Sequence, residues 1–156
     1  MRSFVKSKCL FITTRRRLNV LFENNTAIKQ IQTEKESMQI CKHCVEKGVD
    51  SIEVSGNGIS LVGINEAYFL DFAKKLADEV SIPIILVGGH RSINNMNQIL
   101  HSMDISFLSM SRPLICEPFL VKRWQENELT PSKCISCNSC YSTFAHRCIF
   151  KKTLQN

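Results

Sequence analysis

Two short segments, Gly88-Gly89 and Ser111-Arg112, carry the residue types that hold a phosphate group. Each segment follows an apolar run that reads as a β-strand, IPIILV before the glycines and ISFLSM before the serine. Backbone N–H groups and a guanidinium donate charge-assisted hydrogen bonds to phosphate oxygens. In parallel α/β proteins, ligands bind at the carboxyl ends of strands. We therefore expect Gly88, Gly89, Ser111 and Arg112 to converge on one phosphate, although a glycine pair also serves simply to turn the chain.

A second group that could do chemistry is formed by Cys134, Cys137, Cys140 and Cys148, spaced C-x2-C-x2-C-x7-C. The chain has eight cysteines and no recognisable secretory signal, a combination that favours metal or redox chemistry over a disulfide framework. Closely spaced thiolates can hold a [4Fe–4S] cluster or a tetrahedral zinc ion. We predict an iron–sulfur cluster on these four cysteines, with zinc and the absence of a metal as the alternatives.

The elements that must position these residues alternate between strand and helix. The hydrophobic pattern predicts strands over residues 18–22, 49–55, 82–87 and 105–110, the second of them ended by the GNG sequence at 56–58. Helices are expected over residues 33–48, 66–80, 92–103 and 118–127, with Thr33 and Ser92 as starting residues. This βαβαβαβα order specifies a parallel α/β sheet with right-handed crossover connections.

Composition and charge restrict the class of protein further. No apolar run approaches the ~20 residues of a membrane span, so a membrane protein is not expected. The formal net charge of +6 derives largely from a basic stretch before Glu23. We favour a solvated segment there, with an organelle transit peptide and a nucleic-acid arm as alternatives. Nucleic acid is the weakest of these because aromatic residues are not interleaved with the basic ones. A cytoplasmic location is expected, with organellar targeting as the lesser alternative.

Four segments in a fixed order resemble the C-terminal half of the old yellow enzyme family of NADH:flavin oxidoreductases. They are VDSIEVSG, AYFLDFAKKLADEVSIPIILVGG, SMSRPLICEPFLVKRW and CISCNSC, within residues 33–150. The resemblance implies a partial TIM (β/α)8 barrel of about four βα units. It also implies FMN bound through its phosphate by Gly88, Gly89, Ser111 and Arg112, with NAD(P)H as the reductant. The family commonly has glycine where Ser111 stands, and its cysteine motif usually has three residues between the second and third cysteines.

The resemblance also suggests how the chain is organised and what it does. We expect a basic N-terminal segment over 1–17, the C-terminal half of a βα barrel over 18–130 and a Cys-rich tail over 131–156. The 156 residues fall well below the ~250 of a complete barrel. Four strands alone leave unpaired edges, so a homo-oligomer or a second chain completing the barrel is expected.

The function that the resemblance implies is that of an FMN-dependent NAD(P)H oxidoreductase present as a truncated half barrel. The substrate-binding residues of the family lie mainly in the other half of the barrel, so the catalytic residues are unknown and activity of the chain alone is uncertain. The alternative is a non-catalytic remnant, or a half barrel that binds a partner.

Overall fold

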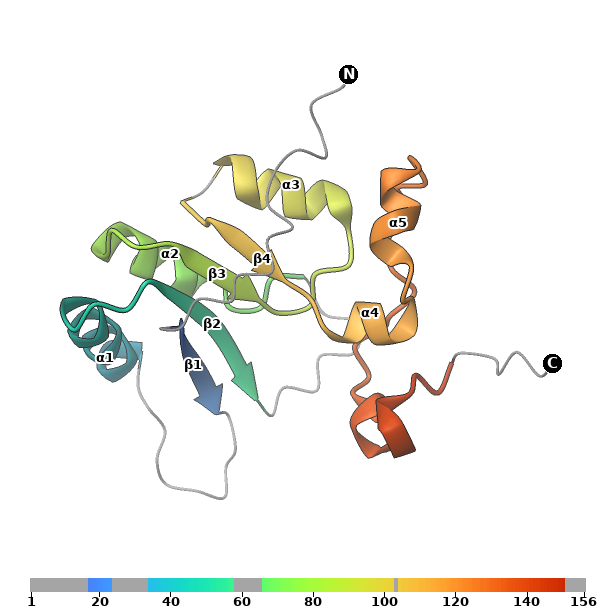
Figure 1. Ribbon diagram of the computed structural model, residues 1–156, viewed down its shortest axis with the longest axis horizontal. Helices are drawn as coiled ribbons and strands as arrows, with labels where there is room; N and C mark the ends of the chain where they lie inside the picture. Colours follow the sequence, from blue (N-terminus) through green and yellow to red (C-terminus); the bar gives the residue numbers. More distant parts are fainter. Residues whose placement is uncertain (1–16, 24–33, 58–65, 103, 151–156) are drawn as a thin grey trace.

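The computed structural model describes residues 17–23, 34–57, 66–102 and 104–150. Within them, a parallel sheet is formed by β1 (Arg17–Glu23), β2 (Ser51–Asn57), β3 (Ile84–Val87) and β4 (Phe107–Ser109). The strands lie side by side in the order β1-β2-β3-β4, as Figure 1 shows. The predicted α/β class and the parallel sheet are therefore confirmed.

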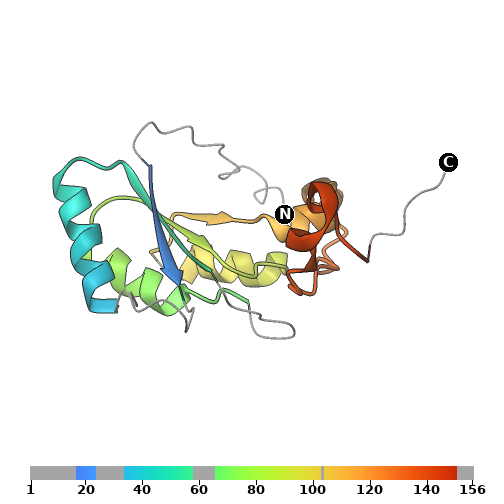
Figure 2. The same cartoon turned by 90° about the horizontal axis from the view of Figure 1, so that it is seen from below.

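Three crossover helices lie on one face of this sheet, as Figure 2 shows: α1 (Glu34–Glu46), α2 (Leu70–Glu79) and α3 (Ile93–Ser102). The chain then continues through α4 (Arg112–Cys116) and α5 (Leu120–Gln125) to two short 3-10 turns, η1 (Ser139–Ser142) and η2 (Phe144–His146). The opposite face of the sheet carries no helix among the described residues. No helix of the described part is long and apolar enough to cross a membrane.

The main core fills the space between the sheet and these helices. Alternate residues of the central strands point into it, and Ile52, Val54, Ile84 and Leu86 are at most 1% exposed. Because successive side chains of a strand point to opposite faces, these four residues lie on the same face of the sheet, whereas Ile85 of β3, which is 5% exposed, points to the other face. Leu76 of α2 completes the core from the helical side. A large aliphatic side chain buried in this way contributes roughly 1.5–3 kcal/mol.

A second, smaller cluster joins α3 to α5. Met96 of α3 packs with Leu120 and Trp124 of α5. The Trp124 indole N–H also donates to the Thr130 carbonyl at 3.0 Å, which holds the segment after α5 against that helix. The position of α5 beside α3 is visible in Figure 1.

Several boundaries differ from the sequence-based prediction. Strand β2 continues through Gly56 and Asn57, which pair with Phe22 and Glu23 of β1, so the GNG sequence does not end the strand at residue 56. Helix α2 begins at Leu70 rather than near Glu66, because Ala67 has the left-handed φ of 61° and a turn follows it.

The helices near the ends of the described part show smaller differences. Helix α4 was not predicted; Pro113 stands in its first turn, a position that suits proline. Helix α5 covers less than the predicted 118–127. The start predicted for α3 is confirmed, since the Asn95 N–H donates to the Ser92 hydroxyl oxygen at 3.4 Å. Thr33 and Gly58 lie outside the described residues.

Candidate functional site

The four predicted phosphate ligands lie at the carboxyl ends of two neighbouring strands. Gly88 and Gly89 directly follow β3, and Ser111 and Arg112 follow β4 at the start of α4. Val87 and Ser109 are register partners in the parallel pair, so the two strand ends lie side by side. The structure thus brings both loops to one edge of the sheet, the edge at which ligands bind in such folds.

Both glycines have backbone conformations that other residues rarely adopt, with φ values of +130° for Gly88 and +70° for Gly89. The space beside Gly89 is filled by an aromatic ring, because a Cβ at this position would lie only 2.3 Å from Tyr68 Cζ. The Gly88 carbonyl accepts hydrogen bonds from the N–H groups of Ala67 (2.8 Å) and Tyr68 (3.3 Å). These hydrogen bonds hold the segment before α2 against the glycine loop. Glycine is required at position 89 for the packing of Tyr68 as well as for the turn.

Tyr68 adds a polar group that the sequence analysis did not single out. Its hydroxyl oxygen is buried and has no hydrogen-bond partner within the described structure. That oxygen is 2.5 Å from the Cβ position of Gly89, so it lies directly at the glycine loop. A buried phenol normally finds a partner, and a phosphate oxygen bound at this loop would supply one. Nothing in the sequence distinguishes Tyr68 from an ordinary core aromatic.

The helix that follows the loop already has an anion at its N-terminus. One carboxylate oxygen of Glu66 accepts hydrogen bonds from the N–H groups of Arg91 and Ser92, both at 3.1 Å, and from the Asn95 amide at 3.2 Å. A carboxylate here is favourable because the start of a helix carries partial positive charge. A phosphate at this site would therefore be bound by the loops and not by the first turn of α3.

His90, next to the glycines, is not a cationic phosphate ligand. Its side chain is buried, with 1% exposure, and its Nε2 is 3.1 Å from the Leu86 carbonyl oxygen. Burial lowers the pKa of His90, although the Leu86 hydrogen bond and the charge of Glu66 act in the opposite direction.

Arg112 points from the start of α4 toward the Cys-rich tail. Its Nη1 donates to the Ser136 carbonyl at 3.4 Å and to the side-chain oxygen of Asn138. Ser136 and Asn138 both have left-handed backbone conformations, with φ of 58° and 62°. These tight turns direct two acceptors to the same guanidinium. The tail therefore positions the arginine that was predicted to bind phosphate.

The Cys-rich tail forms one wall of a pocket against α4. The pocket is lined by five cysteines: Cys116, Cys134, Cys137, Cys140 and Cys148. All five have free thiols. Among the residues that the structure describes, no group of three or more His, Cys, Asp or Glu side chains is arranged to hold a metal ion. The four predicted cysteines thus line one pocket together with Cys116, and metal binding by the tail stays a prediction.

The environments of these thiols differ. Burial raises the pKa of Cys116 to about 12, supported by a hydrogen bond with the Cys148 thiol and by the neighbouring Cys134. Burial and Cys134 also raise the pKa of Cys140. Hydrogen bonds from the side chain and backbone of Ser139 instead lower the pKa of Cys137. Cys116 lies outside the C-x2-C-x2-C-x7-C motif, so spacing alone could not associate it with the tail.

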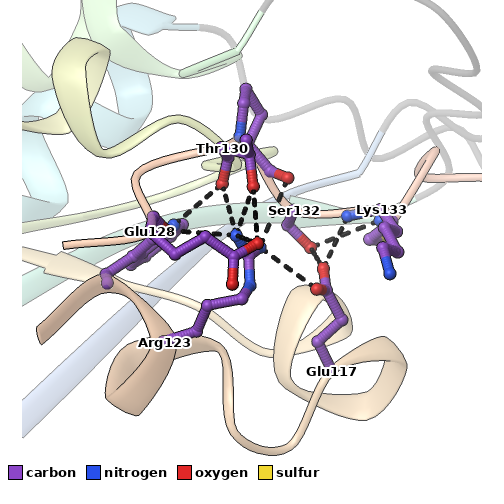
Figure 3. Close-up of polar contacts among 9 residues, drawn as sticks. Glu117, Arg123, Glu128, Thr130, Ser132 and Lys133 are labelled. Atoms are coloured by element: carbon purple, nitrogen blue, oxygen red, sulfur yellow. Dashed lines mark hydrogen bonds and ion pairs between the residues drawn. The ribbon is translucent and has the colours of Figure 1, made fainter. Parts of the chain in front are cut away.

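A polar cluster fastens the beginning of the tail to α5, as Figure 3 shows. The Glu117 carboxylate accepts hydrogen bonds from the Ser132 hydroxyl (2.9 Å) and the Lys133 N–H (2.6 Å), and it pairs with Arg123 at 3.1 Å. The Arg123 guanidinium also donates to the carbonyl oxygens of Glu128 and Thr130, both at 3.1 Å. Burial raises the pKa of Glu117, but these hydrogen bonds and the Arg123 charge outweigh it, so the net shift is downward.

A parallel α/β sheet with loops of this kind at neighbouring strand ends is typical of proteins that bind their ligands at the carboxyl edge of the sheet. Comparisons with known proteins narrow this class. No family model matches the chain. The 4,4'-dithiodibutanoate disulfide reductase of Rhodococcus erythropolis is 34% identical over 93 residues, 57% of this chain and 22% of that protein.

Two further relatives are named as flavin oxidoreductases. The NADH-dependent flavin oxidoreductase iliE of Neonectria sp. (strain DH2) is 31% identical over 118 residues, 63% of this chain and 15% of that protein. The NADH-dependent flavin oxidoreductase iccE of Talaromyces variabilis is 29% identical over 93 residues, 49% of this chain and 22% of that protein. The names of these relatives support the resemblance of the chain to the old yellow enzyme-like family of flavin oxidoreductases. The chain spans between 15 and 22% of the length of these curated relatives.

Solved structures agree at the level of the fold. A 2-naphthoyl-CoA reductase in complex with 2-naphthoyl-CoA matches 80% of this chain and 19% of its own, with a TM-score of 0.58 and 20% identity. A histamine dehydrogenase from Rhizobium sp. 4-9 matches 72% of this chain and 17% of its own, with a TM-score of 0.56 and 19% identity. The arrangement of strands and helices in this chain therefore recurs within much larger proteins.

Proposed function

We propose that this chain carries the FMN phosphate site of an NAD(P)H-dependent oxidoreductase of the old yellow enzyme type, and that it forms about four βα units of a TIM (β/α)8 barrel. The observation that carries the proposal is the convergence of Gly88-Gly89 and Ser111-Arg112 at the ends of two paired parallel strands. The names of the Neonectria and Talaromyces relatives support a flavin and NADH as the redox partners.

The residues present fit an FMN phosphate. The loop at Gly88 and Gly89 has the open backbone conformations that let N–H groups approach an anion, and the buried Tyr68 hydroxyl beside it lacks a partner within the described structure. Arg112 brings a guanidinium with five N–H donors, and the contacts to the tail both come from Nη1. Gly88, Gly89, Tyr68, Ser111 and Arg112 would together hold the phosphate group.

In this proposal the flavin supplies the redox chemistry by accepting hydride from the nicotinamide and passing it to an acceptor. The residues of this chain bind and orient the cofactor through its phosphate, and no residue is assigned to the transfer itself. The acceptor is an activated alkene or an organic disulfide; the name of the Rhodococcus relative brings the disulfide into consideration.

Four strands alone do not close a barrel. Within the described part, β1 and β4 are the edges of the sheet, and the face opposite α1, α2 and α3 carries no helix. Unpaired edges are normally covered or paired, so we propose that a second copy of the chain or another chain completes the barrel. The alternative function is a half barrel without activity of its own, a remnant or a partner-binding unit.

The division into segments 1–17, 18–130 and 131–156, the cytoplasmic location and a [4Fe–4S] cluster or zinc ion in the tail also stay predictions. Metal analysis of the purified chain tests the last of them.

The direct test of the proposal is retention of FMN. Purified chain is mixed with FMN and desalted, and the bound flavin is measured by its absorbance. We expect retained flavin in the wild-type chain and less in Tyr68→Phe, which removes only the hydroxyl oxygen. A wild-type chain that folds but retains no flavin would refute binding by this chain alone and would favour the remnant or partner-binding alternative.

A further inference from the structure

The tail holds the Arg112 guanidinium at one of its nitrogens. Within the described residues, Nη1 donates to the Ser136 carbonyl oxygen at 3.4 Å and to the side-chain oxygen of Asn138. All three residues line the same pocket. A guanidinium is planar and rigid, so two acceptors at Nη1 also restrict the direction in which Nη2 and Nε point. Two N–H groups on one edge of this plane are what binds a phosphate in a bidentate manner.

Asn138 occupies a turn that suits asparagine. Its φ of 62° is left-handed, a conformation that asparagine adopts more readily than most other residues. Its carbonyl oxygen accepts a hydrogen bond from the Tyr141 N–H at 3.0 Å at the start of η1. The turn thus holds the backbone of Asn138 while its side chain contacts Arg112 on α4.

The tail is also attached to both predicted phosphate loops. The Ser132 N–H donates to the Arg91 carbonyl at 2.8 Å, and Arg91 is two residues after Gly89. The Ser132 hydroxyl donates to Glu117, directly after α4, at 2.9 Å. Ser132 itself is buried, with 9% exposure. The segment that carries Asn138 is therefore fixed relative to the loop after β3 as well as to α4.

We propose that Asn138 is a positioning residue of the phosphate site, which holds the Arg112 guanidinium in the orientation that a ligand phosphate requires. The inference rests on the proposed function. A side chain that is immobilised only when the ligand binds weakens binding by about 2- to 10-fold. Asn138 should therefore strengthen the binding of FMN by this factor and leave the binding of riboflavin, which has no phosphate, unchanged.

Two substitutions separate this role from a general effect on the fold. Asn138→Gly removes the side-chain oxygen and keeps a residue that accepts a left-handed conformation. Asn138→Asp keeps an acceptor for Arg112, but its negative charge would pair with the guanidinium and repel a phosphate. The matched control is Asn127→Gly, because Asn127 also has a left-handed φ, 67°, and lies exposed in the turn after α5.

The test is a fluorescence titration of FMN and of riboflavin with the full chain, and the readout is the ratio of the two dissociation constants. We expect the FMN preference of the wild-type chain to fall about 2- to 10-fold in Asn138→Gly. It should fall about tenfold or more in Asn138→Asp. Asn127→Gly should leave it unchanged. In an Arg112→Ala background, Asn138→Gly should have no further effect, because the guanidinium that it positions is absent.

Circular dichroism and urea unfolding establish that each variant is folded. Preparations are compared at equal iron and zinc content, so that a change at the neighbouring cysteines is not mistaken for an effect at Arg112. If Asn138→Gly does not fold, Asn138→Ala and Asn127→Ala replace the glycine pair.

Three results would overturn the positioning role while leaving the proposed phosphate site in place. One is an FMN preference that persists in Asn138→Gly. Another is an equal loss of affinity for FMN and riboflavin, which indicates a general structural effect. The third is the same loss of preference from Asn138→Gly with and without Arg112, because the effect would then not act through the guanidinium. A wild-type chain without any FMN preference would instead contradict the proposed function and this inference together.

Discussion

Replacement of Gly89 by alanine tests the packing of the glycine loop most sharply. Gly89 has φ of +70°, and an added Cβ would lie 2.3 Å from Tyr68 Cζ, 2.5 Å from its Oη and 2.7 Å from its Cε1. Contacts this short require the ring to move. The alanine must also adopt a left-handed conformation that L-residues disfavour. Gly89→Ala should therefore destabilise the chain through two separate effects.

The two effects can be estimated and separated. The left-handed backbone costs about 1–2 kcal/mol, and overpacking against a ring typically costs about 1–3 kcal/mol. We expect Gly89→Ala to lower the free energy of unfolding by about 2–5 kcal/mol, the sum of these effects. Gly48 at the end of α1 is the matched control, because it has φ of +84° but is exposed to solvent. Gly48→Ala should show the backbone cost alone.

The assay is urea unfolding followed by circular dichroism, with a double-mutant cycle. In a Tyr68→Ala background the ring is absent, so adding Gly89→Ala should cost about as much as Gly48→Ala does in the wild-type chain. The coupling energy between the two sites should fall within about 0.5–3 kcal/mol, the range for residues in contact. Equal costs for Gly89→Ala and Gly48→Ala in the wild-type chain, or a coupling energy of zero, would refute the placement of Tyr68 over Gly89.

Three further outcomes are expected. Leu76→Ala removes a side chain with no exposed surface and should lower the free energy of unfolding by about 2–5 kcal/mol in urea, whereas Asp78→Ala on the exposed side of α2 should change it little. The pKa of Glu117 is lowered in the folded chain, so the stabilisation by its carboxylate is present above the unfolded-state pKa and is lost as the pH falls through the folded-state pKa. Glu117→Gln should therefore flatten the acid side of a curve of the free energy of unfolding against pH. An unchanged curve would contradict this. The pKa of the Cys137 thiol is lowered, whereas burial raises the pKa of the Cys41 thiol to about 11. Cys137 should therefore react before Cys41 in timed iodoacetamide labelling read by mass spectrometry, and the reverse order would contradict these environments.

The parallel α/β fold followed from periodicity because the pattern is long and repeated. The continuous apolar run at β3 and the helical spacing in α2 each specify an element without reference to tertiary contacts. Boundaries were less predictable where tertiary contacts decide them. Gly56 and Asn57 extend β2 because β1 offers register partners, and the segment at Ala67 stays outside α2 because it is fastened to the Gly88 carbonyl.

The candidate site was predictable where position along a strand determines position in space. Glycines after one strand and an arginine after the next must meet if the strands are neighbours, and β3 and β4 are neighbours. Tyr68 and Cys116 could not be predicted in the same way. Tyr68 reaches the site from the segment before α2, and Cys116 lines the pocket of the tail cysteines only because α4 and the tail lie against each other. Contacts between segments that are distant in the sequence produce no local pattern of residues from which they could be predicted.

The most direct measurement of the central claim compares FMN with riboflavin, which lacks the phosphate. Flavin fluorescence is titrated with wild-type chain, Arg112→Ala and the control Arg147→Ala, an exposed arginine of the tail. The proposed phosphate site predicts tighter binding of FMN than of riboflavin, a preference that decreases in Arg112→Ala and persists in Arg147→Ala. Equal affinity for the two flavins in the wild-type chain, or an FMN preference unchanged by Arg112→Ala, would contradict a phosphate site built on Gly88, Gly89, Ser111 and Arg112.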